Sequence, residues 1–141
     1  MKYTWVKELE IGDKLVDGQH KELVTMYNNM LDIFDSPNRT NDEKKAEIGK
    51  ALNFLCTYAI QHFTDEEALQ KKLNYPNFEK HREIHEDFKS KAFNLVEKFE
   101  AENDLNKFAL IFKMKIGMWL VTHIKEEDSR ISEYLGMEAV A

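Results

Sequence analysis

The chain has 141 residues, of which 43% are hydrophobic and 33% are charged, a composition typical of one globular domain with its own core. Its formal net charge is −6 and it has no basic cluster, which argues against nucleic acid and against an anionic membrane as partners. No apolar run reaches about 18 residues, so no membrane-spanning helix is expected. One cysteine and an N-terminus without an apolar leader predict a cytoplasmic protein without disulfides.

Apolar residues recur at alternating steps of three and four along most of the chain, which is the pattern of amphipathic helices. The breaks between these stretches contain turn residues. Thr40 with Glu43 fits a capping box, Pro76 suits the start of a helix, and Asp104 is a candidate N-cap. An N-terminal arm and four helices are therefore expected, at about residues 1–15 for the arm and 18–35, 41–73, 77–101 and 104–126 for the helices.

The connections between the expected helices are short, which makes consecutive helices antiparallel neighbours. The sequence thus predicts an all-α protein, an up-down-up-down four-helix bundle that forms a single domain over residues 1–141. Trp5, Leu9 and Ile11 predict that the arm packs against the bundle. Gly49 and Gly117 lie inside helices at a cost of about 1 kcal/mol each relative to alanine, which points to close packing there. With no obvious apolar patch, a monomer is expected.

Every histidine of the chain falls on one of the apolar stripes. In an up-down-up-down bundle the five positions lie at the same end, together with Glu66, which is one helical turn after His62. Burying imidazoles and a carboxylate is costly unless something binds them. Neutral imidazole is a good metal ligand, and five exceed what one tetrahedral zinc ion takes. Two metal ions that share the set and are bridged by carboxylates would account for His20, His62, His81, His85 and His123.

Two other metal-binding patterns are absent. The chain has no H-E-x-x-H, the zinc-protease motif, and no Glu-x-x-His, the motif of carboxylate-rich di-iron bundles. The identity of a carboxylate after His123 stays open on spacing alone, which favours Glu127 or Glu126. Asp128 lies about 140° around an ideal helix from His123 and can join only if the helix loosens or ends near residue 125.

Four motifs in order across most of the chain carry a family resemblance: D-G-Q-H at 17–20, H-F-T-D-E at 62–66, H-R-E-I-H at 81–85 and H-I-K-E-E-D at 123–128. Together they resemble the hemerythrin family, specifically its single-domain bacterial branch. The resemblance implies a non-haem centre of two iron ions joined by an oxo or hydroxo bridge and by two carboxylates. It assigns His81, His85 and His123 to one iron, His20 and His62 to the other, and Glu66 and Asp128 to both.

The resemblance further implies reversible dioxygen binding at the open coordination position of the two-histidine iron, for oxygen storage, transport or delivery rather than catalysis. Two alternatives are an oxygen or redox sensor that acts through a separate partner, and a di-iron peroxidase or nitric-oxide-handling enzyme. An enzyme would want a polar group beside the open position, and the nearest candidate, Tyr58, is more simply a packed aromatic. The expected apolar lining of the oxygen pocket is Leu23, Phe63, Trp119, Leu120 and Ile124.

Overall fold

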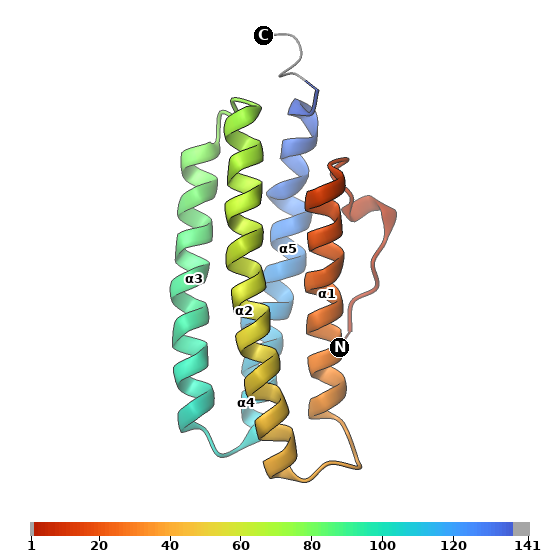
Figure 1. The fold of residues 1–141 in the computed structure, drawn as a ribbon, viewed down its shortest axis with the longest axis vertical. Coiled ribbons are helices and arrows are strands. Elements are labelled where there is room, and N and C mark those ends of the chain that lie inside the picture. Colours follow the sequence, from red (N-terminus) through yellow and green to blue (C-terminus); the bar gives the residue numbers. More distant parts are fainter. Residues whose placement is uncertain (1, 137–141) are drawn as a thin grey trace.

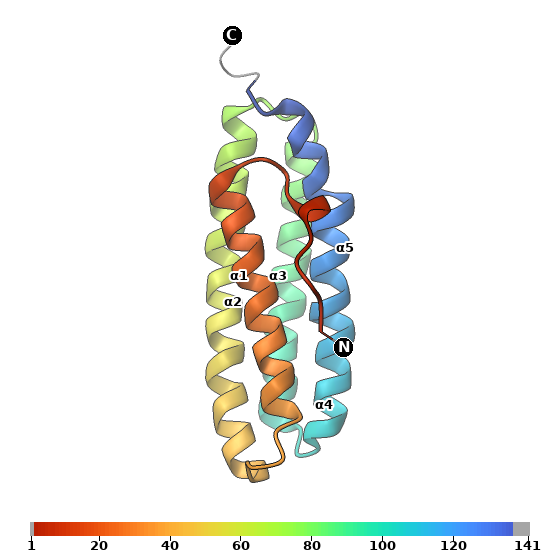
Figure 2. The ribbon, with the colours of Figure 1, turned by 90° about the vertical axis from the view of Figure 1, so that its right-hand side faces the viewer.

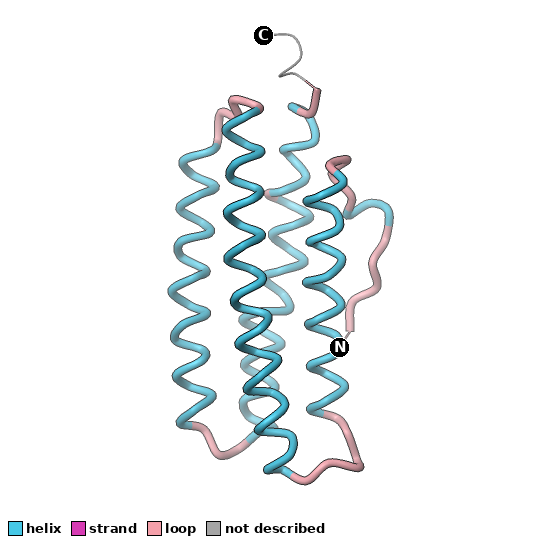
Figure 3. Tube along the Cα trace, viewed as in Figure 1, coloured by secondary structure: helices cyan, strands magenta, loops and turns pink. Residues whose placement is uncertain are grey.

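The computed structural model of the chain describes residues 2–136, and all regular elements in that range are helical (Figure 3). Residues 1 and 137–141 of the expected domain lie outside the described residues. The main helices are α1 (Lys14–Phe34), α2 (Asn41–Lys72), α3 (Phe78–Ala101), α4 (Leu105–Phe112) and α5 (Trp119–Glu126). None of the helices within residues 2–136 is long and apolar enough to cross a membrane.

The helices form an antiparallel four-helix bundle, as expected from the short connections. Figure 1 shows α1, α2, α3 and the continuous α4–α5 rod side by side, each running opposite to the one before it. The prediction of an all-α bundle is confirmed. The main core runs along the bundle axis and is filled mostly by leucine, phenylalanine and isoleucine, including Leu31, Ile48, Leu52, Phe108 and Phe112.

The first helix begins four residues before the expected position, so the arm ends at residue 13 rather than 15. Asp13 is the N-cap, and its carboxylate accepts a hydrogen bond from the Val16 amide at 3.0 Å. Asp17 instead accepts from the amides of Ile11 and Gly12, at 2.8 and 3.0 Å. The extra turn of helix forms because Asp13 satisfies amide groups that would otherwise lack partners.

The N-terminal arm packs against the outside of the bundle. It contains a short 3₁₀ turn, η1 (Lys7–Leu9), and runs beside α1 (Figure 2). Tyr3 and Asn28 exchange two hydrogen bonds, at 3.0 and 2.8 Å, and Leu9 is buried in the main core. Trp5 is partly buried against the same core. The expected packing of the arm is confirmed.

The second and third helices begin close to their expected positions. Thr40 and Glu43 form the predicted capping box at the start of α2, with the Glu43 amide donating to Thr40 Oγ1 at 3.1 Å. The α3 helix starts at Phe78, just after Pro76. Asp104 caps α4 by accepting from the amides of Asn106 and Lys107. Local capping chemistry therefore sets these helix starts.

The fourth expected helix, 104–126, is not one regular α-helix. Between α4 and α5 the chain forms a π-helical segment, η2 (Lys113–Met118), and after α5 it continues as a 3₁₀ helix, η3 (Asp128–Tyr134). Gly117 lies in η2 against the buried ring of Tyr27, where an added Cβ would stand 2.7 Å from Tyr27 Cε1 and closer still to the hydroxyl oxygen. The wide turn and the missing side chain together accommodate the tyrosine.

Candidate metal centre

The bundle brings all seven sequence-predicted ligand residues into one buried layer. They come from the start of α1, the end of α2, the start of α3, from α5 and from the first residue of η3, which lie at one end of the bundle (Figure 1). No more than 5% of any of the seven is exposed to solvent: His20, His62, Glu66, His81, His85, His123 and Asp128.

The imidazole Nε2 atoms gather into two groups. In the two-histidine group, His20 Nε2 lies 3.1 Å from His62 Nε2. In the three-histidine group, His123 Nε2 lies 3.1 Å from His81 Nε2 and 3.2 Å from His85 Nε2. This division is the one that the family resemblance implies.

The Glu66 carboxylate lies between the two groups and turns one oxygen toward each. Its Oε2 is 3.3 Å from His20 Nε2 and 3.2 Å from His62 Nε2. Its Oε1 is 3.1 Å from His81 Nε2 and 3.3 Å from His85 Nε2. A single carboxylate thus reaches both sets of nitrogen atoms.

The Asp128 carboxylate has the same arrangement. Its Oδ2 lies 2.9 Å from His20 Nε2, while Oδ1 lies 2.9 Å from His81 Nε2 and 3.1 Å from His123 Nε2. Each histidine group together with the two carboxylates offers ligand atoms that all lie within 4.8 Å of one another. Each group could therefore hold one metal ion.

Asp128 reaches this layer because the α-helix ends just before it. α5 stops at Glu126, and the tighter η3 turn begins at Asp128 itself, which is fully buried. Glu126 is exposed and Glu127 is partly exposed. The expectation from ideal helix spacing, which favoured Glu127 or Glu126, was wrong because the helix does not stay regular to that point.

Two histidines have partners on their outer ring nitrogen. His62 Nδ1 lies 2.8 Å from Gln19 Oε1, and His85 Nδ1 lies 2.8 Å from Glu67 Oε2. Both oxygens only accept hydrogen bonds, so each Nδ1 carries the proton. Each Nε2, whose lone pair is then available to a metal ion, faces the Glu66 carboxylate.

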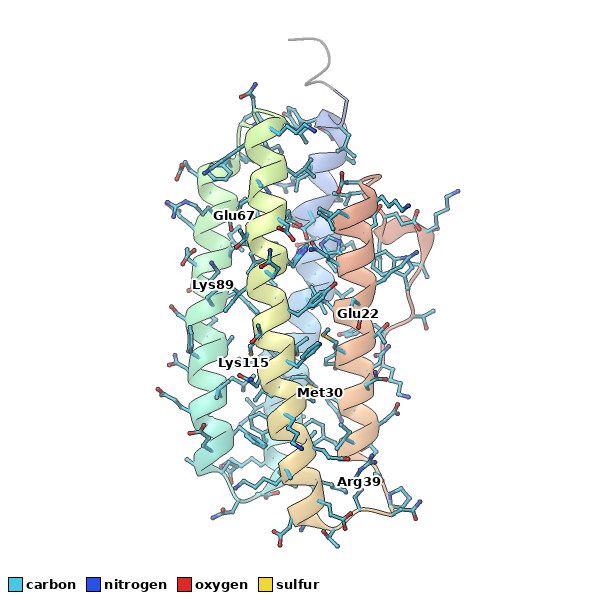
Figure 4. The ribbon with its side chains drawn as sticks, viewed as in Figure 1. Glu22, Met30, Arg39, Glu67, Lys89 and Lys115 are labelled. Atoms are coloured by element: carbon cyan, nitrogen blue, oxygen red, sulfur yellow. The ribbon has the colours of Figure 1, made fainter. Side chains whose placement is uncertain are left out.

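Gln19 and Glu67 were not predicted from the sequence, although each is next to a ligand residue in the chain. Neighbouring residues on a helix point about 100° apart, so Gln19 and Glu67 fall outside the apolar stripes that mark the core face. The signal that could have found them is chemical: metal-bound imidazoles usually donate their other ring N–H to an oxygen. Figure 4 labels Glu67 on α2, at the end of the bundle where α2 and α3 join.

The buried atoms at the centre fit metal ions better than they fit one another. All four oxygens of Glu66 and Asp128 are buried and lack a hydrogen bond of acceptable geometry, despite the nearby nitrogen atoms. His62 Nε2 and Glu66 Oε2, at 3.2 Å, are both acceptors, and such a pair is unfavourable in a dry core without a cation. Imidazole and carboxylate ligands together suit iron and other first-row divalent metals.

Without a metal ion, the two buried carboxylates favour the protonated form of His20 and His81. Burial lowers the pKa of His20, but the Asp128 and Glu66 carboxylates outweigh it and raise that pKa to about 10. The same balance raises the pKa of His81 to about 9. Burial raises the pKa of the Glu66 carboxyl, but the surrounding imidazoles hold it well below its usual range. A metal ion binding at neutral pH would therefore displace protons from the site.

A partly enclosed cavity of about 20 Å³ adjoins the centre, which is room for a ligand about the size of a water molecule. Of the five histidines, it touches His20, His62 and His123. Apart from those three, Asp128 and the Cys56 thiol, its lining is apolar. The residues expected to line an oxygen pocket all lie on its wall: Leu23, Phe63, Trp119, Leu120 and Ile124.

Aromatic rings pack flat against two of the imidazoles. Phe63 stacks on His85 with ring centroids 4.1 Å apart, and Trp119 stacks on His123 at 4.4 Å. Trp119 also stacks on Phe88, at 3.9 Å. These contacts restrict rotation of the histidine rings and shield them from water.

A histidine-rich, carboxylate-containing centre in the core of a four-helix bundle defines a non-haem metal-binding protein. The chain belongs to the hemerythrin family: the family described as "Hemerythrin HHE cation binding domain" matches residues 12–135. Members of this family bind dioxygen at a non-haem di-iron site.

Curated relatives agree with this assignment. The chain is 34% identical to the bacteriohemerythrin of Methylococcus capsulatus, over 89% of this chain and 90% of that protein. It is 29% identical to the myohemerythrin of Theromyzon tessulatum, over 89% of this chain and 88% of that protein. The crystal structure of a wild-type hemerythrin superposes with a TM-score of 0.76 and 28% identity, over 94% of this chain and 97% of that one.

Proposed function

We propose that this protein binds dioxygen reversibly at a centre of two iron ions, for oxygen storage, transport or delivery. The three-histidine group would hold one ion and the two-histidine group the other, with Glu66 and Asp128 bridging them. The division of the Nε2 atoms into three and two, and the placement of one carboxylate oxygen toward each group, support this assignment. The set gives the second ion one fewer histidine, which leaves room for a ligand.

The observation that carries the proposal is the apolar cavity beside the two-histidine group. Bound ferrous iron would supply the open coordination position and the electrons with which dioxygen is held. The chain supplies the rest: Leu23, Phe63 and Leu120 line the space and exclude water. Excluding water protects a bound oxygen ligand from displacement and from side reactions.

A peroxidase or nitric-oxide-handling enzyme at the same centre would need a proton donor beside the open position. Apart from the histidines and Asp128, the ionisable group on the cavity wall is the Cys56 thiol, and burial raises the pKa of that thiol. A neutral thiol is a poor proton donor and a poor nucleophile. The lining therefore favours ligand binding over catalysis.

An optical spectrum recorded through one cycle of oxygenation tests the proposal. Iron-loaded protein is reduced without oxygen, exposed to air and then deoxygenated. We expect charge-transfer bands that appear with air and disappear when oxygen is removed. Bands that appear and stay would indicate oxidation and favour a redox enzyme or sensor. An absence of bands would contradict a di-iron centre.

Replacing Leu23 by phenylalanine should lower the affinity for dioxygen, or the rate at which it binds, by about tenfold. For the affinity, this corresponds to about 1.4 kcal/mol of binding free energy. The variant should keep its iron. Leu23 lines the cavity, and the larger ring would fill it. Stopped-flow oxygen mixing and iron analysis measure the two effects. Leu31→Phe is the matched control, because Leu31 is equally buried on α1 but does not line the cavity. Equal oxygen kinetics in the two variants would contradict the pocket assignment.

A further inference from the structure

A chain of three side chains connects the helix surface to the two-histidine group. Gln19 on α1 reaches across to α2, where its Nε2 donates to Asp65 Oδ2 at 2.7 Å. At its other end, Gln19 Oε1 accepts from His62 Nδ1 at 2.8 Å. Gln19 is buried, whereas Asp65 is partly exposed. From the surface inward, the hydrogen-bonded groups are therefore a carboxylate, an amide and an imidazole.

The orientation of the Gln19 amide decides which ring nitrogen of His62 carries a proton. With the oxygen facing His62, Nδ1 is protonated and Nε2 keeps a lone pair for a metal ion. With the amide reversed, the NH₂ group would donate to Nδ1, and the ring proton would have to sit on Nε2. A protonated Nε2 cannot bind a metal ion. The two orientations have nearly the same shape, so packing alone separates them poorly.

Asp65 resolves this choice. An ionised carboxylate only accepts hydrogen bonds, so it attracts the NH₂ end of Gln19 and repels the oxygen end. We propose that Asp65 is a positioning residue: by holding the Gln19 amide in one orientation, it keeps His62 Nε2 available for the second metal ion. The metal itself rests on the proposed function, but the orientation of Gln19 and the proton on His62 Nδ1 do not.

In the three-histidine group, His85 has no such dependence. The outer nitrogen of His85 contacts the Glu67 carboxylate directly, at 2.8 Å, and a carboxylate accepts from Nδ1 whichever way it turns. A change at Asp65 should therefore affect the two-histidine group and leave the other group intact. This selectivity separates positioning from a general loss of stability.

The first test is Asp65→Asn. Asparagine has nearly the same shape but can present either oxygen or NH₂ to Gln19, so the amide is free to reverse. Nitrogen NMR of the metal-free protein should show His62 Nδ1 protonated in the wild type and partly deprotonated in the variant. Chelator competition on the ferrous protein should show one iron bound about 10- to 100-fold more weakly, and the other unchanged.

Two further variants make the test specific. Gln61 Nε2 donates to the other oxygen of Asp65, at 3.0 Å, whereas the ring nitrogens of His62 pair with Gln19 and His20, so Gln61→Ala should change neither readout. Gln19→Glu combined with Asp65→Asn should restore both. In that pair the asparagine NH₂ donates to one oxygen of the new carboxylate, and the other oxygen accepts from His62 Nδ1. The double variant thus has the same series of hydrogen-bond donors and acceptors, but the negative charge is at position 19 instead of position 65.

A fully protonated His62 Nδ1 in Asp65→Asn, or iron affinity within about twofold of the wild type, would overturn the inference. Failure of the double variant to recover either readout would do the same. If the wild-type chain binds no iron, the proposed function fails, and the Nδ1 measurement alone then decides whether Asp65 orients Gln19. The two ideas can therefore fail separately.

Discussion

Replacing His62 by alanine is expected to leave the chain with at most one iron ion and without reversible dioxygen binding. The two-histidine group would then retain one imidazole, His20, together with two carboxylates that the other ion also uses. The truncation also opens the cavity beside the centre, since His62 forms part of its wall. Loss of a residue that hydrogen-bonds to a metal ligand typically lowers metal affinity by about 10- to 100-fold. Loss of the ligand itself should lower it further.

Iron per chain after anaerobic reconstitution is the measurement, followed by the optical cycle in air. Thr64→Ala is the matched control: Thr64 lies two residues further along α2, is exposed, and donates its hydroxyl hydrogen to the Ile60 carbonyl. It should hold two iron ions. Helical circular dichroism on both variants checks that the bundle still forms. Two ions bound to His62→Ala would show that His62 is not a ligand.

Replacing Gly117 by alanine is expected to lower the free energy of unfolding by about 1–3 kcal/mol. The added Cβ would fall 2.5 Å from Tyr27 Cζ, and Tyr27 is fully buried, so its ring cannot move without disturbing the core. The direction of the change in the free energy of unfolding distinguishes a steric clash from helix propensity. By helix propensity alone, alanine in place of glycine would stabilise a helix by about 1 kcal/mol.

Gly18→Ala is expected to change the free energy of unfolding in the opposite direction. Gly18 lies in α1, and a Cβ added there would meet nothing within 4 Å. That variant should gain up to about 1 kcal/mol. Denaturant unfolding of the metal-free proteins compares the two, without a contribution from metal binding. If both glycines respond alike, close contact with Tyr27 is not the reason for glycine at position 117.

Part of the metal centre follows from the sequence because it depends on regular geometry. His62 with Glu66, and His81 with His85, are four residues apart, which places each pair on one face of a helix. Short connections then bring the ends of neighbouring helices together. The convergence of His20 and His123 with them needs only the alternating direction of the helices.

Asp128 and the π-helical segment do not follow from regular geometry. An ideal helix through residue 128 would turn Asp128 away from His123, and the family resemblance, not spacing, pointed to it. The helix instead ends at Glu126, and the turn that follows carries the carboxylate inward. Likewise η2 departs from the α-helical period around Gly117, where the Tyr27 ring from α1 presses against the chain.

By itself, the sequence determined the four-helix bundle, the buried end at which the histidines meet, and the pairs that share a helix face. These features depend on the spacing of residues along one chain segment and on short loops. Only the tertiary structure decided that Gln19 and Glu67 contact His62 and His85, and that the residues expected to line a pocket leave a cavity of about 20 Å³ between them. Such features depend on how side chains from different helices pack, and local periodicity carries no information about that.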